Sequence, residues 1–188
     1  ERNLWDWPGI HIAERGTGST EVWLTEVRKI DELDGFYVRS FTICKDKILF
    51  PSGNHCYIAL ADKETLTVLA RYPVTPEISG MAYILPIGNY FYITVSSDLQ
   101  YNQRHATILR TTDLNSLQYG IYEDLRTELP IGGIPYYIER IHGQYYITNG
   151  AAKRGIWKFG VEQDVITDVS VVYWIYRKGI GQFQNEII

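Results

Sequence analysis

Three stretches of the sequence follow one pattern, and this internal repetition limits the possible folds more than any other feature of the chain. Each stretch has an apolar run, a tight polar turn and a second run that ends in small polar residues. The stretches are residues 36–53, 80–98 and 133–150. Glycine and asparagine in the turns, as at Gly88, Asn89 and Gly143, supply the positive φ angle that a tight hairpin needs. Each stretch is therefore predicted to be a β-hairpin.

Two more strands are predicted after each hairpin, so that every repeat becomes a four-stranded unit. They lie at residues 56–61 and 66–72 in the first unit, 106–110 and 117–122 in the second, and 155–159 and 165–174 in the third. The units begin about 44 and about 53 residues apart, which is in the range of β-propeller blades. The sequence therefore predicts an all-β fold, and a β-propeller of four-stranded blades is the favoured architecture.

The aromatic composition agrees with this prediction. The chain contains 15 tyrosines and 5 tryptophans among its 188 residues. These residue types favour strands because they fit a half-buried pleated surface. Tyr92, Tyr146 and Trp157 fall in predicted strands, and we expect them to pack between neighbouring units.

A partial unit comes before the three complete ones, with strands predicted at residues 10–14 and 22–27. The chain is interpreted as a single all-β domain, residues 1–188, or as a propeller fragment of three to four blades. The partial blade is assigned to residues 5–34, the blades to about 35–75, 78–125 and 132–177, and the C-terminal tail to 178–188. Because closed propellers usually have four or more blades, this count favours part of a larger ring or assembly. A β-sandwich with long hairpins is the alternative.

Charge and hydropathy argue against two classes of partner. The formal net charge is −4, from 18 basic and 22 acidic residues, and the lysines and arginines form no stripe. The electrostatic signature of a nucleic-acid-binding protein is therefore missing. No stretch of about 18 apolar residues occurs, so no membrane span is predicted. The compartment is not determined, with an extracellular or surface-associated location slightly favoured.

The two cysteines, Cys44 and Cys56, are predicted to lie on different strands of one unit. They form either a cross-strand pair or two buried thiols that behave as small apolar residues. Two cysteines are too few for a zinc site, and neither His55 nor His105 has a second ligand at metal spacing. No metal and no cofactor are therefore expected.

A four-stranded unit has two distinct ends, and one of them is the expected place for a binding site. The loops after the second strands and the links between units leave at one end, whereas the tight turns lie at the other. Loops on a rigid scaffold often carry function. The predicted binding residues are Asn54, His55, Asp98, Arg104, Asn149 and Arg154. The same residue types are also what ordinary turns require.

Residues 92–98 with 108–117, and residues 134–147, resemble blades of five-bladed propeller glycosidases. The resemblance implies acidic residues lining a central funnel, among them the pair of carboxylates that glycoside hydrolysis uses. On this sequence it points to Asp6, which precedes Trp7 and Pro8, and to Glu139 as catalytic candidates. Gly133 stands where the resemblance would place an acid before Ile134.

Residues 51–58 resemble the Gly-Asn-His strand of NHL-type propellers, which bind proteins or RNA, but the motif occurs once. No phosphate-binding loop, dinucleotide fingerprint or zinc-protease motif is present. The sequence therefore favours a non-catalytic binding or structural propeller that contacts a protein or glycan through its loop face. The alternatives are a glycosidase-like propeller acting on polysaccharide and a virion or cell-surface component that serves as a rigid spacer.

Overall fold

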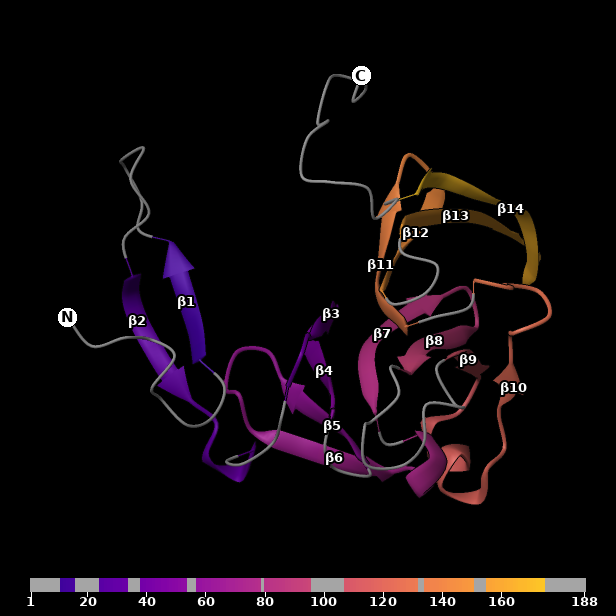
Figure 1. Ribbon diagram of the computed structural model, residues 1–188. Coiled ribbons are helices and arrows are strands. Elements are labelled where there is room, and N and C mark those ends of the chain that lie inside the picture. The colour runs from indigo at the N-terminus through magenta and orange to yellow at the C-terminus, as the bar shows by residue number, and fades with distance from the viewer. Residues whose placement is uncertain are drawn as a thin grey trace.

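The computed structural model describes residues 11–15, 24–33, 38–53, 57–78, 80–95, 107–131, 134–150 and 155–174. These residues form three antiparallel four-stranded sheets and one two-stranded sheet (Figure 1). The predicted all-β chain with repeated four-stranded units is therefore confirmed. Within the part of the chain that the structure describes, no helix has the length and apolar character needed to cross a membrane.

Each sheet consists of strands that are neighbours in the order of the sequence. Sheet 1 contains β3 (Thr42–Cys44), β4 (Lys47–Pro51), β5 (Tyr57–Asp62) and β6 (Val68–Pro73). Sheet 2 contains β7 (Met81–Ile87), β8 (Tyr90–Val95), β9 (Thr107–Thr111) and β10 (Glu123–Asp124). Sheet 3 contains β11 (Ile134–Ile141), β12 (Gln144–Gly150), β13 (Gly155–Glu162) and β14 (Val165–Trp174). The two-stranded sheet pairs β1 (His11–Arg15) with β2 (Leu24–Lys29).

The three large sheets follow one another along a curved path (Figure 1). The first strands β3, β7 and β11 lie on the inner side of the curve, and the last strands β6, β10 and β14 lie on the outer side. Consecutive sheets touch, because β7 contacts β3 and β4, and β11 contacts β7 and β8. The sheets therefore stack in sequence order, face against face.

In each of the three large sheets, the first strand or the segment that leads into it has one more residue than the strand opposite. The pairs on either side of this irregularity are Val38–Ser52 and Thr42–Leu49 in sheet 1, Met81–Val95 and Tyr83–Thr94 in sheet 2, and Pro135–Asn149 and Tyr137–Thr148 in sheet 3. A β-bulge of this kind leaves one residue without a partner opposite. The sequence repeat is therefore also a repeat of backbone geometry.

Sheet 2 is buried on both of its faces. Successive strand residues point to opposite faces, so Tyr92 belongs to the apolar cluster shared with sheet 3 and Ile93 to the cluster shared with sheet 1. Both side chains are 0% exposed. On the sheet 3 side, the Phe159 ring stacks on Tyr92, with ring centroids 6.2 Å apart. This alternation explains the nearly continuous apolar runs of β7 and β8.

The expectation that the strand aromatics pack between neighbouring sheets is confirmed at Tyr92 and Trp157, and Tyr146 is not part of that packing among the described residues. Tyr92 and Trp157 are buried in the cluster between sheets 2 and 3. Tyr146 is half-buried and points to the other face of sheet 3, because its neighbours Tyr145 and Ile147 occupy that cluster.

Strands β2, β6 and β10 are each followed by a short link that packs apolar side chains against the next sheet. Two of these links contain a 3-10 helix, η2 (Asp31–Leu33) after β2 and η3 (Pro76–Ile78) after β6. The buried residues of the links are Ile30 and Leu33 on sheet 1, Val74 and Ile78 on sheet 2, and Leu125, Leu129 and Ile131 at sheet 3. The links therefore fill the space between one sheet and the next.

Hydroxyl groups of one sheet also donate hydrogen bonds to backbone carbonyls in the first strand of the next sheet. The hydroxyl of Ser40 donates to the Ala82 carbonyl at 2.5 Å, and Thr42 donates to the Ile84 carbonyl. Likewise, Thr94 donates to the Tyr136 carbonyl at 2.8 Å. Ala82 and Tyr136 are the extra residues of the bulges in β7 and β11. These bonds matter because a buried carbonyl without a partner is costly.

The turn ends of sheets 2 and 3 are held together by Arg110 and Asp164. The guanidinium of Arg110 donates to the Asp164 carbonyl at 2.6 Å and to the Glu123 carboxylate at 2.7 Å. The side-chain amide of Asn89 donates to the Asp164 carboxylate at 3.1 Å. The tight turns of these two sheets thus lie at the same end of the stack.

The strand predicted at residues 117–122 is wrong, because this segment begins as a 3-10 helix, η5 (Leu114–Tyr119). The carboxylate of Asp113 accepts a hydrogen bond from the Asn115 amide at 2.9 Å, which caps the helix start. Gly120, with a φ of 70°, ends the helix in the left-handed conformation. The fourth strand of sheet 2 is only the two residues of β10.

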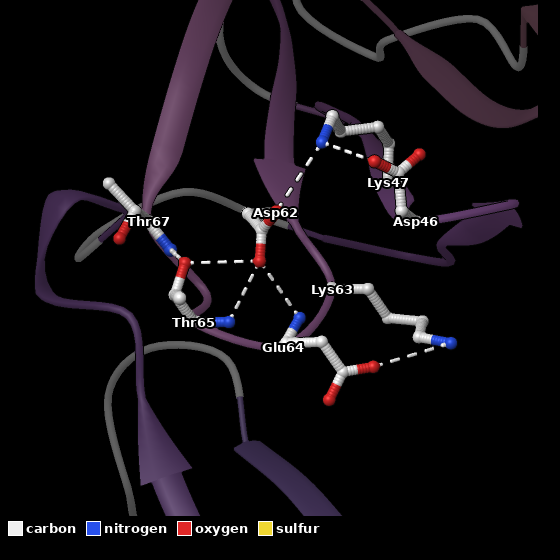
Figure 2. A network of polar contacts seen from close by, with 7 residues as sticks. All are labelled: Asp46, Lys47, Asp62, Lys63, Glu64, Thr65 and Thr67. Carbon is white, nitrogen blue, oxygen red and sulfur yellow. Dashed lines mark hydrogen bonds and ion pairs between the residues drawn. The ribbon is translucent and has the colours of Figure 1, made fainter.

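The turn between β5 and β6 is organised by the carboxylate of Asp62 (Figure 2). It accepts hydrogen bonds from the backbone amides of Thr65 at 2.9 Å and Glu64 at 3.0 Å, and from the Thr65 hydroxyl. The ammonium of Lys47 lies 3.3 Å away and also contacts Asp46. These interactions, led by the Thr65 amide, lower the pKa of Asp62 to about 2.

We predict that Ile84→Ala lowers the free energy of unfolding by about 2–5 kcal/mol, because it leaves a cavity between sheets 1 and 2. The matched control is Ile43→Ala, at a position that is 56% exposed. Its effect is expected to stay within about 0.5 kcal/mol. Urea unfolding of both variants measures the difference, and equal losses would contradict the stacked arrangement.

We predict that the stabilisation by Asp62 depends on pH. Its pKa is lower in the folded protein than its usual value of 3.8, so the carboxylate stabilises the fold above that pH. The contribution is lost as the pH falls towards about 2. Asp62→Asn keeps an acceptor in the turn but cannot titrate, so it should be less stable than wild type at pH 6 and equally stable at low pH. A gap in melting temperature that does not change with pH would refute this role.

Candidate functional site

The structure describes two of the residues proposed as functional from the sequence. Asn149 lies at the end of β12 and is 7% exposed, and Glu139 is an exposed residue of β11. The other binding candidates, Asn54, His55, Asp98, Arg104 and Arg154, lie outside the described residues, as does Asp6.

The most exposed aromatic pair of the inner strands is formed by Tyr136 and Tyr137 on β11. Their exposed fractions are 42% and 41%. In a regular strand, neighbouring side chains point to opposite faces of the sheet, so two consecutive tyrosines would lie on different faces. The bulge between Pro135 and Tyr137 changes the direction of the side chain at its extra residue. Both rings are accessible at this irregular point of the strand.

The ring of Tyr136 is supported by the bare backbone of Gly150 on β12. A Cβ atom at Gly150 would lie 2.8 Å from Cε2 of Tyr136, closer than atoms can approach. The backbone of Tyr136 is fixed as well, because its carbonyl accepts the hydrogen bond from Thr94. Glycine at position 150 therefore makes room for a ring that rests on the sheet.

The ring of Tyr137 is supported from sheet 2 by Tyr83. The two ring centroids lie 4.3 Å apart and the planes are tilted by 41°. Tyr83 is 5% exposed, and its burial raises the pKa of its hydroxyl to about 12. Tyr83 is therefore uncharged at neutral pH and backs the exposed ring without contributing a charge.

Glu139 adds a carboxylate beside this aromatic pair. The hydroxyl of Tyr137 donates to Oε2 of Glu139 at 3.3 Å, because residues two apart on a strand share a face. We call Tyr136, Tyr137, Glu139 and Gly150 the β11 platform. It offers flat apolar rings and hydrogen-bonding groups on a rigid strand, which is the composition of many ligand sites.

The described residues contain no group of three or more histidine, cysteine, aspartate or glutamate residues that could hold a metal ion. Cys44 is a free thiol, and Cys56, its predicted cross-strand neighbour, lies outside the described residues. Burial raises the pKa of the Cys44 thiol, which makes it less reactive than an exposed cysteine.

Sequence reasoning missed Tyr136 and Tyr137 as a pair. Two consecutive tyrosines in a strand suggest one buried and one exposed ring, and the hairpin pattern gives no sign of the bulge. The available signals were Pro135, which is disfavoured inside a regular ladder, and Gly150 at the facing strand end. Together they indicate a point where the backbone departs from regular strand geometry and where the facing strand leaves room for a side chain.

A comparison of the chain with known proteins found no matching family model, no matching curated protein and no matching solved structure. The functional assignment therefore depends on the geometry of the described residues.

We predict that Gly150→Ala displaces the ring of Tyr136, because the new methyl group and the ring cannot both occupy the present position. The chemical shifts of the Tyr136 ring should change in the variant. In a Tyr136→Ala background the same substitution should have no effect on stability, since the obstacle is gone. A wild-type ring position in Gly150→Ala would show that the glycine is not required there.

Proposed function

We propose that the three sheets are blades of a β-propeller and that β1 and β2 are part of another blade, in a larger ring or assembly. Four observations support this: the sequential strand order, the repeated bulge, the stacking of consecutive sheets and the curved path with the first strands innermost. In a propeller, innermost strands and the loops at one end line the usual binding surface.

We further propose that the protein is a non-catalytic binding module that contacts a glycan through this surface. The observation that carries the proposal is the β11 platform, with two exposed rings held in place from behind. Tyrosine rings present large rigid apolar faces together with a polar hydroxyl, which suits the apolar face and the hydroxyl groups of a sugar. Glu139 supplies an acceptor for sugar hydroxyl groups on the same strand face.

The predicted loop residues belong to the same proposal. The paired positions Ser52, Val95 and Asn149 lie at or next to the ends of the second strands, at the same point of the repeat. The loops that follow contain Asn54 and His55, Asp98 and Arg104, and Arg154. The Thr94–Tyr136 hydrogen bond joins sheets 2 and 3 near this end. We propose that these loops extend the contact surface around the platform.

The test is a panel of oligosaccharides of defined composition, screened by intrinsic fluorescence and titrated by calorimetry. Tyr136→Ala and Tyr137→Ala should each weaken binding of the best oligosaccharide by about tenfold or more, as anchor residues do. Tyr119→Ala is the control, because Tyr119 is 72% exposed on η5, away from β11. Equal loss in the control, or binding of a protein instead of any sugar, would count against the glycan assignment.

A glycosidase-like activity is the second candidate, because the exposed carboxylate of Glu139 lies beside the aromatic pair. This reading requires a second carboxylate, for which Asp6 is the candidate, at a separation of about 5–10 Å. Glu139→Gln separates the two proposals. It should abolish hydrolysis of a bound oligosaccharide if the protein is an enzyme, whereas a binding module shows no hydrolysis in either form.

A further inference from the structure

The hydrogen bonds of the β11 platform have a direction. The hydroxyl of Tyr137 donates its proton to Oε2 of Glu139 at 3.3 Å, and the backbone amide of Arg140 donates to Oε1 at 3.1 Å. A phenol has one proton and a carboxylate has none, so neither Tyr137 nor Glu139 has a proton left to donate to a ligand. This side of the platform therefore offers only hydrogen-bond acceptors.

Tyr83 reinforces this direction from sheet 2. Burial is the main cause of the raised pKa of its hydroxyl, and a hydrogen bond to Tyr137 raises that pKa further. A hydrogen bond raises the pKa of a hydroxyl when the hydroxyl is the donor, because ionisation would remove the shared proton. Tyr83 therefore donates to Tyr137, which donates to Glu139, and both protons point towards the carboxylate.

The charge of Glu139 is not neutralised by a neighbouring cation. In the part of the chain that the structure describes, no lysine, arginine or histidine side chain forms an ion pair with it. The guanidinium of Arg140 lies over the ring of Tyr145, which faces sheet 2, at 5.9 Å from the ring centroid. Lys158 is two strands away from Glu139, with Tyr146 between them. The carboxylate therefore presents its negative charge to a ligand.

We propose that the β11 platform recognises a sugar residue that carries a protonated amino group, such as glucosamine, in preference to a neutral or an acidic residue. This inference rests on the proposed glycan binding and adds the chemistry of the ligand. An ammonium group has three protons to donate and no lone pair, so it matches the acceptors of Tyr137 and Glu139. It also carries the positive charge that a carboxylate and the face of a tyrosine ring both attract.

Other sugar substituents fit this site less well. A hydroxyl group can donate to Glu139 but brings no charge, and an acetylated amine has lost its charge and two of its protons. A sugar carboxylate or sulfate brings only acceptors and a negative charge, which the carboxylate of Glu139 repels. The hydroxyls of Tyr136 and of Thr148, which is exposed opposite Tyr137, can donate or accept and do not change this order.

The test compares three oligosaccharides of one length and one linkage, built from glucosamine, N-acetylglucosamine or glucose. Each is titrated by calorimetry at about pH 5.5, where a glutamate is ionised and a sugar amine is protonated. The glucosamine oligosaccharide should bind about fivefold more tightly than the other two, or better. Added salt should reduce this ratio, because it screens the contact between the charges.

Two glutamate variants assign the preference to the platform. Glu139→Gln should bring the ratio of the glucosamine and glucose affinities to within about twofold of one, because the charge is lost and the new amide has protons of its own. Glu64→Gln is the matched control, since it changes the net charge by the same amount on sheet 1, where the Glu64 side chain is 80% exposed. It should leave the ratio unchanged.

Three results would overturn the inference, and they separate it from the proposed function. A glucosamine oligosaccharide that binds no more tightly than the other two removes the amino preference, while the wider panel still decides whether the protein binds a glycan. Equal loss of the ratio in Glu64→Gln and Glu139→Gln assigns the preference to the net charge of the chain. Binding of a lysine-rich peptide, with no oligosaccharide bound, overturns both proposals. The comparison of the three oligosaccharides needs no variant and so does not depend on the folding of Glu139→Gln.

Discussion

The stacking of one sheet on the next is the interaction on which the rest of the structure depends. A four-stranded sheet of strands this short cannot bury enough apolar surface by itself, so each face needs a neighbour. Sheet 2 has a neighbour on both sides, and Tyr92 and Ile93 are accordingly both fully buried. The links and the hydroxyl–carbonyl hydrogen bonds then set the orientation of each sheet relative to the next. The orientation of the sheets in turn determines which way the side chains of the inner strands point.

The support of the β11 platform is a consequence of the same stacking. Sheet 2 supplies Tyr83 behind the ring of Tyr137 and Thr94 beneath the carbonyl of Tyr136. The exposed rings are thus positioned by residues 42 and 54 positions earlier in the chain, across a sheet interface. A change in the packing of sheets 2 and 3 would alter the platform even if no residue of β11 were replaced.

Local sequence pattern was sufficient for most strands and insufficient for the features that depend on neighbours. The hairpin turns at Gly88 and Gly143 were predictable because a positive φ angle strongly favours glycine, and the strand predicted at residues 165–174 is β14. The segment after Asp113 was predicted as a strand because its apolar residues also fit a strand pattern. A short helix forms instead, and the side chain of Asp113 caps its first turn. Pro135 and Gly150 indicate an irregular point of the strand, but the exposure of the two tyrosine rings depends on how β11 and β12 pair, which the local pattern does not give.

Native-state hydrogen exchange tests the stacking most directly, through the second strands β4, β8 and β12. Each of these strands is hydrogen-bonded on both sides within its own sheet, so differences among them report how well the sheet faces are covered. We expect the amides of β8, in the sheet with a neighbouring sheet on both faces, to exchange most slowly. Faster exchange in β8 than in both β4 and β12 would contradict a central sheet 2 and the stacked order that follows from it.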